Sequence, residues 1–551
     1  MKNTSIRWIK NRTKKTRFKM ALLILGNAIF SILLILFAFA IKKVVDSAVA
    51  RNMHEFTKSA IFVGGIVVLQ FFLRLFNQGL EEDIKARIEI NCKSHIFSKI
   101  LVKKYEKING YHSGELINRL TNDVNIVSEG VTTLVPSIVA AVVRLISAII
   151  ALILLDAIFV VAFILAGILV FLIASILGTK LKHLHKKTQE SEGKTRSFMQ
   201  EIIENLLSVK VFSVNDKVEQ KANELQEKNY KVKMKKRNFS IFGNSAFHFI
   251  FSAGYVFALI FGGYKLSLGI IGYGDLSAIL QLVNNVQVPL ASLSSVFSKY
   301  YSIIASAERL MEIEEIEEEQ LNKVVDGKSY YKKMQSINIS NVTFGYEKSA
   351  VLKNASLTIN KGDFLAIMGT SGIGKSTLIK LILGVYLPEK GEISLSTKKE
   401  KIILDGSTRN LFAYVPQGNA LFSGTIRENI SFINSNASQE RIKEVLNLSC
   451  CLEFIEKLPN GLETEIGEQG EGLSEGQVQR IAIARALLSE APILLFDEAT
   501  SALDEETEKR LLENLKTLKD VTLILITHKK AALSMCNRKI KIKKGTIVEN
   551  E

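Results

Sequence analysis

Residues 369–377 carry glycine, lysine and serine at the spacing of a phosphate-binding loop, G-x-x-x-x-G-K-S. Glycines at 369, 372 and 374 let the backbone curl so that its N–H groups converge on phosphate oxygens. The helix expected to start at Lys375 adds partial positive charge at the same point. Lys375 can reach the β- and γ-phosphates, and the Ser376 hydroxyl can bind Mg²⁺. The residues predicted to hold the phosphates are Gly369, Thr370, Ser371, Gly372, Ile373, Gly374, Lys375, Ser376 and Thr377.

Two further apolar strands end in residues that suit the same chemistry. The strand expected at 492–496 runs into Asp497 and Glu498. Asp497 can hold Mg²⁺, directly or through water, and Glu498 can orient or deprotonate the water that attacks the γ-phosphate. A third strand, expected at 521–526, leads to His528, and open α/β sheets bind ligands at the carboxyl ends of their strands. Together with a strand at 364–368 before the loop, this alternation predicts a P-loop α/β domain.

The 551-residue chain divides into two compositions, with long apolar runs in its N-terminal part and a soluble-domain composition after about residue 323. The net charge of +16 does not indicate nucleic-acid binding, because much of the basic charge flanks apolar segments. Eight Lys and Arg residues between Lys2 and Lys19 precede the first apolar segment, which is the positive-inside pattern of a membrane protein. The four cysteines, at 92, 450, 451 and 536, lack metal-type spacing and are expected to be free cytoplasmic thiols.

A helix that crosses a bilayer needs about 20 mostly apolar residues. Six segments meet this requirement: Met20–Val45, Ala60–Leu80, Val131–Leu155, Ala157–Leu177, Phe242–Leu266 and Leu276–Ser298. The first is longer than the apolar core of a signal peptide, and no small-residue cleavage site follows it. Lys and Arg concentrate at the N-terminus and in two long connections of helical periodicity, 81–130 and 180–240. An even number of spans then places both termini in the cytoplasm.

An acidic stretch, 305–323, follows the sixth span. It holds Glu312, Glu314, Glu315, Glu317, Glu318 and Glu319. We expect a helical link with a solvated face and assign it no other role.

The motif Leu473-Ser-Glu-Gly-Gln477 resembles the signature of ATP-binding cassette (ABC) proteins. The other motifs of that family occur in its order: Tyr346, the loop at 369–377, Gln417 in Val-Pro-Gln, the signature, Asp497-Glu498, Ser501-Ala-Leu-Asp504 and His528. Residues 413–430 and 464–470 look like the export branch, and Ser113–Val124 resembles the first cytoplasmic loop of the same exporters. The resemblance spans nearly the whole chain.

This resemblance implies a half-transporter that uses ATP and Mg²⁺ and dimerises, so that one subunit's phosphate loop meets the other's signature. Tyr346 would stack on adenine, and His528 would contact the γ-phosphate beside the catalytic Glu498. Gln417 would sense Mg²⁺ and nucleotide and pass the change to the membrane helices. The implied metal site is Ser376, Gln417 and Asp497, and the signature residues that would face the γ-phosphate are Ser474, Gly476 and Gln477.

One residue departs from the family's commonest signature, because Glu475 stands where glycine is usual. Glu498 and His528 are both present, so nothing marks the subunit's own site as degenerate. A homodimer is therefore favoured, with a heterodimer as the alternative.

Several polar side chains fall inside the predicted spans. Arg74, Arg144 and His248 are ionisable, and Gln281, Asn284 and Asn285 share one face of the sixth span. Such residues can line a water-filled substrate path. They can equally form hydrogen bonds between helices, and Arg74 can extend to the bilayer interface. The sequence leaves both interpretations open.

We therefore predict a multidomain membrane protein, an all-α six-helix transmembrane domain followed by a P-loop α/β nucleotide-binding domain. The expected divisions are a basic cytoplasmic N-terminus at 1–19, the transmembrane domain at 20–305, a linker at 306–336 and the ATP-binding domain at 337–551. The expected function is ATP-driven export across the cell (plasma) membrane by alternating access of a dimer.

Two other function classes remain to be weighed. An ATP-gated channel or regulator could use the same architecture. A soluble or DNA-organising P-loop ATPase is excluded by the six apolar spans. The cargo could be a peptide, a lipid or a xenobiotic, and no sequence feature selects among them.

Overall fold

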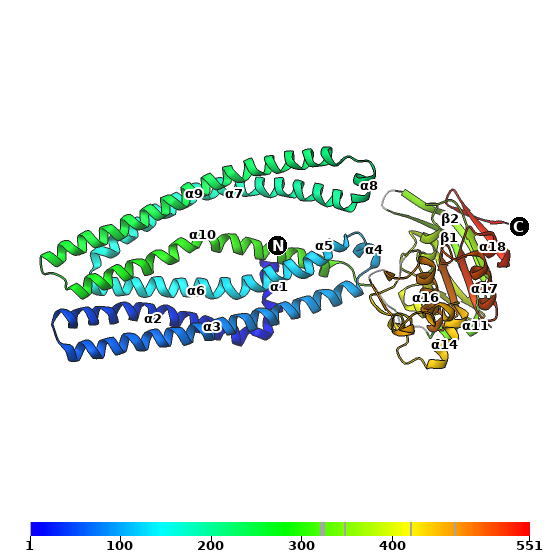
Figure 1. The fold of residues 1–551 in the computed structure, drawn as a ribbon, viewed down its shortest axis with the longest axis horizontal. Helices are drawn as coiled ribbons and strands as arrows, with labels where there is room; N and C mark the ends of the chain where they lie inside the picture. The colour runs from blue at the N-terminus through cyan, green and yellow to red at the C-terminus, as the bar shows by residue number, and fades with distance from the viewer. Residues whose placement is uncertain are drawn as a thin grey trace. The chain divides into compact units, whose positions relative to one another are not determined.

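The computed structural model describes residues 2–319, 326–346, 349–418, 421–467, 470–518 and 520–550. The chain forms two compact units (Figure 1). The helical unit comprises Met1–Leu101 and Ser113–Glu315, and the α/β unit comprises Val102–His112 and Ile316–Glu551. The predicted fold class is confirmed, because a helical membrane domain precedes a P-loop α/β domain. The predicted domain boundaries stay predictions.

The helical unit contains nine α-helices and two short irregular turns among the described residues. The helices are α1 (Lys2–Arg12), α2 (Arg17–Val49), α3 (Met53–Val102), α5 (Ser113–Asn118), α6 (Val124–Leu155), α7 (Ala157–Glu204), α8 (Leu206–Val211), α9 (Asn215–Ser267) and α10 (Tyr273–Glu315). A 3₁₀ turn at Lys14–Thr16 precedes α2, and a π-helical turn at Arg119–Asp123 precedes α6.

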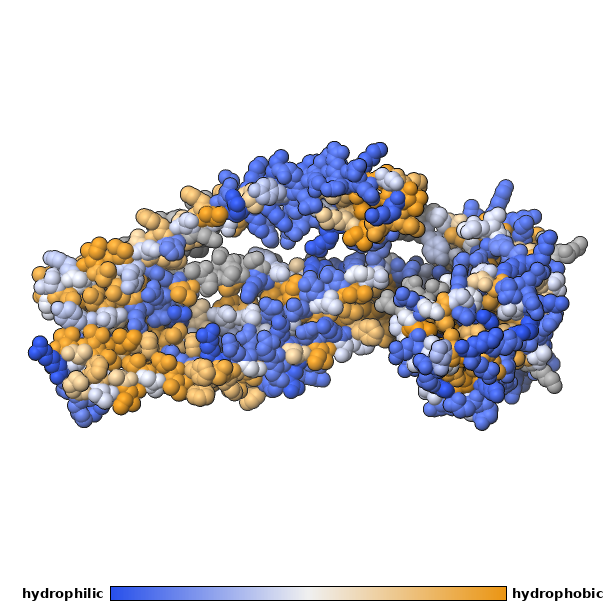
Figure 2. Space-filling model, viewed as in Figure 1, coloured by the Kyte–Doolittle hydropathy of each residue, from blue (hydrophilic) through white to orange (hydrophobic). Residues whose placement is uncertain are grey.

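Four segments of the described chain are long and apolar enough to cross a bilayer: Lys14–Val49, Met53–Val102, Ser113–Leu155 and Asn215–Ser267. They contain four of the six predicted spans. The other two predicted spans lie in α7 and α10, which include side chains outside the described set. A broad band of apolar surface covers the ends of these helices away from α8 (Figure 2). Such a band suits lipid contact.

The helices continue far beyond the apolar segments. In α3, four inward-facing residues recur at every fourth position, and each is at most 1% exposed: Ile84, Ile88, Cys92 and Ile96. This spacing places one apolar stripe against the neighbouring helices. Helices α2, α6 and α10 pack on one another, while α7 pairs with α9 and diverges from the others toward α8 (Figure 1).

The connection between the third and fourth predicted spans is as short as the sequence predicts. Asp156 is the only residue between α6 and α7, and its carboxylate accepts a hydrogen bond from the Ile158 amide at 3.0 Å. It therefore caps α7. The Lys265 ammonium of α9 donates to the same carboxylate. One residue thus joins three helices at this end of the unit.

The acidic stretch differs from the prediction in two ways. Helix α10 ends at Glu315 rather than Lys323, residues 316–319 are not helical, and 320–325 lie outside the described residues. The carboxylates are also paired rather than simply solvated. The pairs are Glu312 with Arg119, Glu314 with Arg12, Glu317 with Lys104, Glu318 with Lys103 and Glu319 with Arg409. Cations from distant parts of the sequence meet this run only in the folded chain, so local periodicity could not predict the pairing.

The α/β unit has twelve strands among the described residues. They are β1 (Met334–Tyr346), β2 (Ser349–Asn360), β3 (Phe364–Met368), β4 (Lys390–Thr397), β5 (Lys401–Ile403), β6 (Phe412–Val415), β7 (Gly424–Thr425), β8 (Glu465–Ile466), β9 (Ile493–Asp497), β10 (Thr522–Ile526), β11 (Arg538–Lys543) and β12 (Thr546–Asn550). The three strands predicted around the site appear as β3, β9 and β10.

Nine α-helices of the described chain belong to this unit. They are α4 (Tyr105–Ile108), α11 (Gly327–Lys333), α12 (Lys375–Ile382), α13 (Ile426–Ser431), α14 (Gln439–Leu448), α15 (Leu452–Ile455), α16 (Glu475–Leu488), α17 (Glu505–Lys516) and α18 (Lys530–Met535), where α4 comes from the segment that interrupts the helical unit. Short 3₁₀ turns lie at Gly406–Leu411 and Gly461–Glu463.

The main sheet has the order β12-β11-β3-β10-β9-β6, and β11, β3, β10, β9 and β6 run parallel. A second, antiparallel sheet has the order β2-β1-β4-β5. Alternate residues of the parallel strands enter two different cores: Leu495 packs with the antiparallel sheet, and Phe496 packs with α16 and α17. Because both faces are buried, β3, β6, β9 and β10 are nearly continuous apolar runs, whereas β11, next to the edge strand, alternates lysine with isoleucine. Their carboxyl ends share one edge.

Candidate ATP-binding site

The predicted phosphate-binding loop lies between β3 and α12. Gly369, Gly372 and Gly374 have φ values of 155°, 75° and 111°, in the region that glycine enters without strain. Gly374 precedes α12 directly, and no side chain caps the helix. The first N–H groups of the helix therefore remain available to an anion. A methyl group at Gly374 would lie 2.6 Å from Val351 Cγ1, so this glycine is also required by packing.

Lys375 lies across the loop. Its ammonium donates to the Gly369 carbonyl at 2.8 Å and the Thr370 carbonyl at 3.3 Å, and it lies 3.1 Å from His528 Nε2. The side chain is almost completely buried. The structure thus brings together a lysine and a histidine that are 153 residues apart. Both face the position that the loop geometry suits for the terminal phosphates.

Asp497 ends β9 beside the loop. The Ser376 hydroxyl donates to its Oδ1 at 3.0 Å, and the Tyr414 hydroxyl approaches its Oδ2 at 3.4 Å. Burial raises the pKa of the Asp497 carboxyl, and the Ser376 hydroxyl opposes that shift. A hydroxyl and a carboxylate are the oxygen ligands that Mg²⁺ takes from a protein when water and phosphate supply the others. The donor set therefore fits Mg²⁺ with nucleotide.

Glu498 follows Asp497 and has a left-handed backbone, with φ of 53°. Its Oε2 accepts a hydrogen bond from Gln417 Nε2 at 2.8 Å. Gln417 lies just after β6, which pairs with β9, so strand register alone places the two side chains at one edge. The structure brings together all the predicted catalytic and metal residues: Ser376, Gln417, Asp497, Glu498 and His528.

Tyr346, the predicted adenine contact, ends β1. Its hydroxyl lies 3.2 Å from Thr377 Oγ1, next to the phosphate-binding loop. The ring packs edge-on against Tyr386, with centroids 5.5 Å apart, and the side chain is 39% exposed. A partly exposed ring beside the loop suits a stacking contact with a base.

The signature begins α16. Ser474 caps the helix: its hydroxyl accepts from the Gln477 amide, and Gln477 Oε1 accepts from the Ser474 amide at 2.8 Å. Gly476 is required by packing, because a methyl group there would lie 2.9 Å from the Ala502 carbonyl. Glu475 is exposed in the first turn of α16, where its negative charge interacts favourably with the positive end of the helix dipole. Within the described chain, no hydrogen bond or ion pair joins this motif to residues 369–377.

Two residues around the site were missed at the sequence level. Tyr414 lies on β6 and approaches Asp497, and Lys529 follows His528. A tyrosine in an apolar strand and a lysine in a loop have no motif that marks them. The alternation along β6, which turns Tyr414 away from Val415 and Ala413, was the one available signal.

The polar residues predicted inside the membrane spans differ in their surroundings. Arg144 Nε and Nη2 donate to Asn285 Oδ1 at 2.9 and 2.6 Å, which joins α6 to α10. Asn285 is buried and the neighbouring Asn284 is exposed, so the predicted common face is divided. Arg74 and His248 are exposed. The Gln281 side chain is half-buried.

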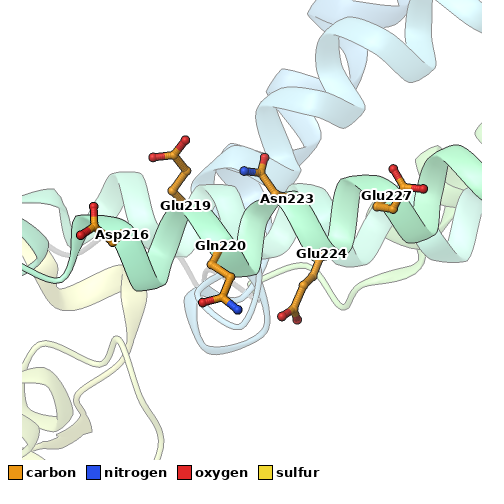
Figure 3. A pocket seen from close by; sticks show the side chains of 6 residues that line it. All are labelled: Asp216, Glu219, Gln220, Asn223, Glu224 and Glu227. Carbon is orange, nitrogen blue, oxygen red and sulfur yellow. The ribbon is translucent and has the colours of Figure 1, made fainter.

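A pocket elsewhere in the helical unit is lined by one helix. Its side chains all come from the polar face of α9: Asp216, Glu219, Gln220, Asn223, Glu224 and Glu227 (Figure 3). They project from the helix without converging on a point, and no phosphate-binding backbone lies among them. This surface has none of the features of the nucleotide site.

Comparison with known proteins supports the same conclusion. The family profile described as ABC transporter transmembrane region matches residues 20–290, and the one described as ABC transporter matches residues 352–501. The ATP-dependent lipid A-core flippase of Desulfotalea psychrophila is 30% identical over 495 residues, or 90% of this chain and 84% of the flippase. The ATP-dependent permease MDL1 of Candida albicans is 30% identical over 488 residues, or 86% of this chain and 70% of the permease.

The solved structure of a bacterial Atm1-family ABC exporter with ATP bound has the same fold. It superposes with a TM-score of 0.81 at 24% identity and covers 97% of this chain and 95% of the exporter. The matched regions include both units and lie in the order that the sequence predicts. This chain therefore belongs to the ABC transporter family, as an ATP-hydrolysing membrane exporter with its transmembrane region and ATPase in one polypeptide.

Proposed function

We propose that two copies of this chain form a homodimer with two MgATP sites, and that ATP-driven closure of those sites switches the membrane cavity from inward- to outward-facing. The isolated signature supports the dimer. Ser474, Gly476 and Gln477 make no hydrogen bond to residues 369–377 within the described chain, although their amides and hydroxyl suit a phosphate. A second subunit would bring this helix end to the nucleotide. A heterodimer would satisfy the same geometry.

The observation that carries the proposed ATP hydrolysis is that two adjacent carboxylates, Asp497 and Glu498, each accept a hydrogen bond from a different neutral side chain. Asp497 receives the Ser376 hydroxyl, and Glu498 receives the Gln417 amide. Bound Mg²⁺ would neutralise charge on the transferring phosphoryl group. Ser376 and Asp497 are placed to hold it, while Glu498 is placed to orient the attacking water and accept its proton. Lys375, His528 and the loop amides would hold the phosphates.

Gln417 gives the site a means of sensing its own state. Its amide is bonded to Glu498, so a water or metal that takes this carboxylate must compete with that bond. Gln417 itself is exposed and lies in the loop after β6. A change of partner at Gln417 would therefore move a surface loop. We propose that this movement is passed to the membrane helices.

The tip of the α7–α9 hairpin offers a surface for the second subunit. Around α8, three apolar side chains are largely exposed: Leu207 at 78%, Val211 at 68% and Phe212 at 73%. They form an apolar patch beside highly charged helix surface (Figure 2). Clustered apolar exposure of this kind marks protein contact. Basic residues flank the hairpin tip, and this charge pattern supports a cytoplasmic location.

We further propose that both termini are cytoplasmic and that the protein resides in the plasma membrane, because Lys and Arg concentrate at the N-terminus and in the two long connections. The cargo is a peptide, a lipid or a xenobiotic. Two relatives are named lipid A-core flippases, so lipids come first in a cargo panel.

The test of the proposed chemistry is Glu498→Gln. This change keeps the side-chain volume and removes the base, so ATP binding should persist while turnover falls by about 10² or more. Lys375→Ala should instead weaken ATP binding, because it removes a charged phosphate contact. The measurements are the steady-state ATPase rate and equilibrium binding of a fluorescent ATP analogue.

Dimer closure is measured by a cross-link between two introduced cysteines, Ser371→Cys in one subunit and Glu475→Cys in the other, because the four native cysteines are buried. Both positions are exposed, and neither is a proposed metal ligand. In the Glu498→Gln background, ATP should trap the cross-linked form. Near-normal hydrolysis by Glu498→Gln would remove the base assignment, and absence of the cross-link in trapped protein would remove the shared site.

A further inference from the structure

Glu498 begins a loop, and its own backbone is strained because its φ of 53° is left-handed. Such a conformation needs support from neighbouring groups. A left-handed conformation at a residue other than glycine costs roughly 1–2 kcal/mol, and it persists only where the surroundings fix it. Here the Glu498 amide donates to the Ile526 carbonyl at 3.2 Å, and the Ser501 amide donates to the Glu498 carbonyl at 3.1 Å. The first bond attaches the segment 498–503, which we call the post-carboxylate loop, to the end of β10, and the second closes a turn within the loop.

Lys529, in the segment after β10, holds the same loop through its side chain. Its ammonium donates to the Thr500 carbonyl at 2.9 Å and to the Leu503 carbonyl, and it lies 3.9 Å from the Glu508 carboxylate. Two of the three ammonium donors are used by the loop carbonyls, and the contact with Glu508 is an ion pair rather than a hydrogen bond. Because Lys529 directly follows His528, one short segment contacts both the phosphate-facing lysine and the post-carboxylate loop.

Glu508 is the unusual member of this cluster. It lies on the inward face of α17 with Leu511, Leu512 and Leu515, where the helical spacing predicts a fourth apolar residue. Its side chain is only 1% exposed. A carboxylate in such a position is costly unless a cation pairs with it. The chain retains a buried acid here, and that acid draws the Lys529 ammonium inward to the loop carbonyls.

A second contact supports the loop from the signature helix. Gln479 of α16 donates from Nε2 to the Ser501 hydroxyl at 3.0 Å and accepts from the Ala502 amide at 3.1 Å. The post-carboxylate loop is thus held between α16 on one side and the segment after β10 on the other. Displacing either support would release the strained conformation at Glu498.

We propose that Lys529, oriented by the buried Glu508, is a positioning residue for ATP hydrolysis that fixes the post-carboxylate loop and thereby the Glu498 carboxylate. This inference rests on the proposed role of Glu498. The Lys529 ammonium donates to the loop carbonyls of Thr500 and Leu503, whereas Lys375 and His528 are the side chains that face the phosphate-binding loop. The effect of Lys529 should therefore appear in the rate of hydrolysis and not in ATP affinity.

The test compares variants of Lys529 that differ in charge and donors. Lys529→Met alone leaves the Glu508 charge buried without a cation, so the decisive variant is the double change Lys529→Met/Glu508→Gln, which removes both charges. Its kcat should fall about 10²-fold, because small misplacement of a catalytic group has effects of that size. The ATP dissociation constant should stay within about twofold of the parent value. Lys529→Arg, which keeps charge and donors, should retain most of the activity.

A matched control uses an ion pair of the same unit away from the site. Arg538 Nη1 lies 2.6 Å from Asp363, which is also mostly buried. Arg538→Met/Asp363→Asn should lower the unfolding temperature without changing kcat at a permissive temperature. If the Lys529/Glu508 double variant behaves like this control, the pair is a stabilising contact and the proposal is wrong.

A second measurement separates this proposal from the role of Glu498. In a Glu498→Gln background, adding Lys529→Met/Glu508→Gln should lower the residual rate by less than about twofold, because residues that act through one group are not additive. A full additional loss would overturn the proposal while leaving Glu498 as the base. Near-normal hydrolysis by Glu498→Gln itself would reject the proposed function first.

Discussion

The α/β unit and the helical unit use buried polar residues in different ways. In the α/β unit, polar side chains from four loops meet at one sheet edge, and Ser376 reaches Asp497 across 121 residues of sequence. In the helical unit, charged groups join helix to helix. The Asp123 carboxylate, fully buried before α6, accepts from Arg309 Nε at 2.8 Å and from the Ser306 hydroxyl at 2.9 Å.

The difference follows from the secondary structure. Parallel strands end at one edge, so their terminal residues converge without any side-chain attraction. Long helices have no such common edge, and their relative positions depend on packing and on pairs such as Arg119 with Glu312, 2.9 Å apart. Substitution of polar residues in the α/β unit should therefore change ligand binding and catalysis. Substitution of polar residues in the helical unit should change folding stability and the coupling between ATP hydrolysis and transport.

The largest effect on ligand binding should come from the phosphate-binding loop. Gly374→Ala forces φ of 111° on alanine and places its methyl group against Val351, so ATP affinity should fall by about tenfold or more. Gly372→Ala is the matched variant, because φ is 75° but no atom lies within 4 Å of the added methyl group. Its effect should be smaller. Equal affinities for both variants would show that packing at Gly374 does not define the loop.

In the helical unit, Asp123→Ala should mainly destabilise the fold. It removes a buried carboxylate that accepts from Arg309 and Ser306, and because the Arg309 side chain is 43% exposed and water can replace its partner, the loss should cost about 2 kcal/mol of unfolding free energy. Asp83→Ala is the control, because its pairs with Lys19 and Arg87 are exposed, where ion pairs contribute about 0–1 kcal/mol. The measurement is the thermal unfolding midpoint in detergent. A drop in ATP affinity with unchanged stability would contradict the division between the units.

Arg144→Leu tests whether polar residues inside the spans also serve transport. The change should lower the substrate-stimulated ATPase rate roughly fivefold, equivalent to about 1 kcal/mol, and leave the basal rate and expression unchanged. Asn284→Leu, at the exposed neighbour of Asn285, should have little effect. Loss of folded Arg144→Leu protein would instead assign the bond to Asn285 a purely structural role.

The smallest effect on activity, and a direct test of orientation, comes from surface labelling. Met53, the first residue of α3, and Leu268, in the turn after α9, are exposed between spans, so Met53→Cys and Leu268→Cys should react with an impermeant thiol reagent in intact cells. Gly269, the neighbouring position, has φ of 70° and is better left as glycine. The native cysteines are all buried, so they provide no topology signal, and Ser98→Cys serves as the cytoplasmic reporter. Labelling of Ser98→Cys from outside would reverse the proposed orientation.

Local pattern was sufficient for most of the nucleotide site. The loop at 369–377, the strand before Asp497 and the strand before His528 are short-range features, and each was recognisable without tertiary information. The convergence of Lys375 with His528 followed from the expectation of parallel strands. The prediction of a solvated helix face for the acidic stretch was wrong, because the partners of Glu314 and Glu318 lie some 200 to 300 residues away in sequence.

The sequence by itself determined the class of this protein: apolar length defined membrane helices, and loop spacing defined an ATPase. Only the tertiary structure decided which polar groups act on one another. The left-handed Glu498, its bond to Gln417 and the Lys529–Glu508 support depend on strands and helices that meet after folding. Local propensity does not predict contacts between residues that are distant in sequence. A buried charge is stable only when such a distant partner pairs with it in the folded chain.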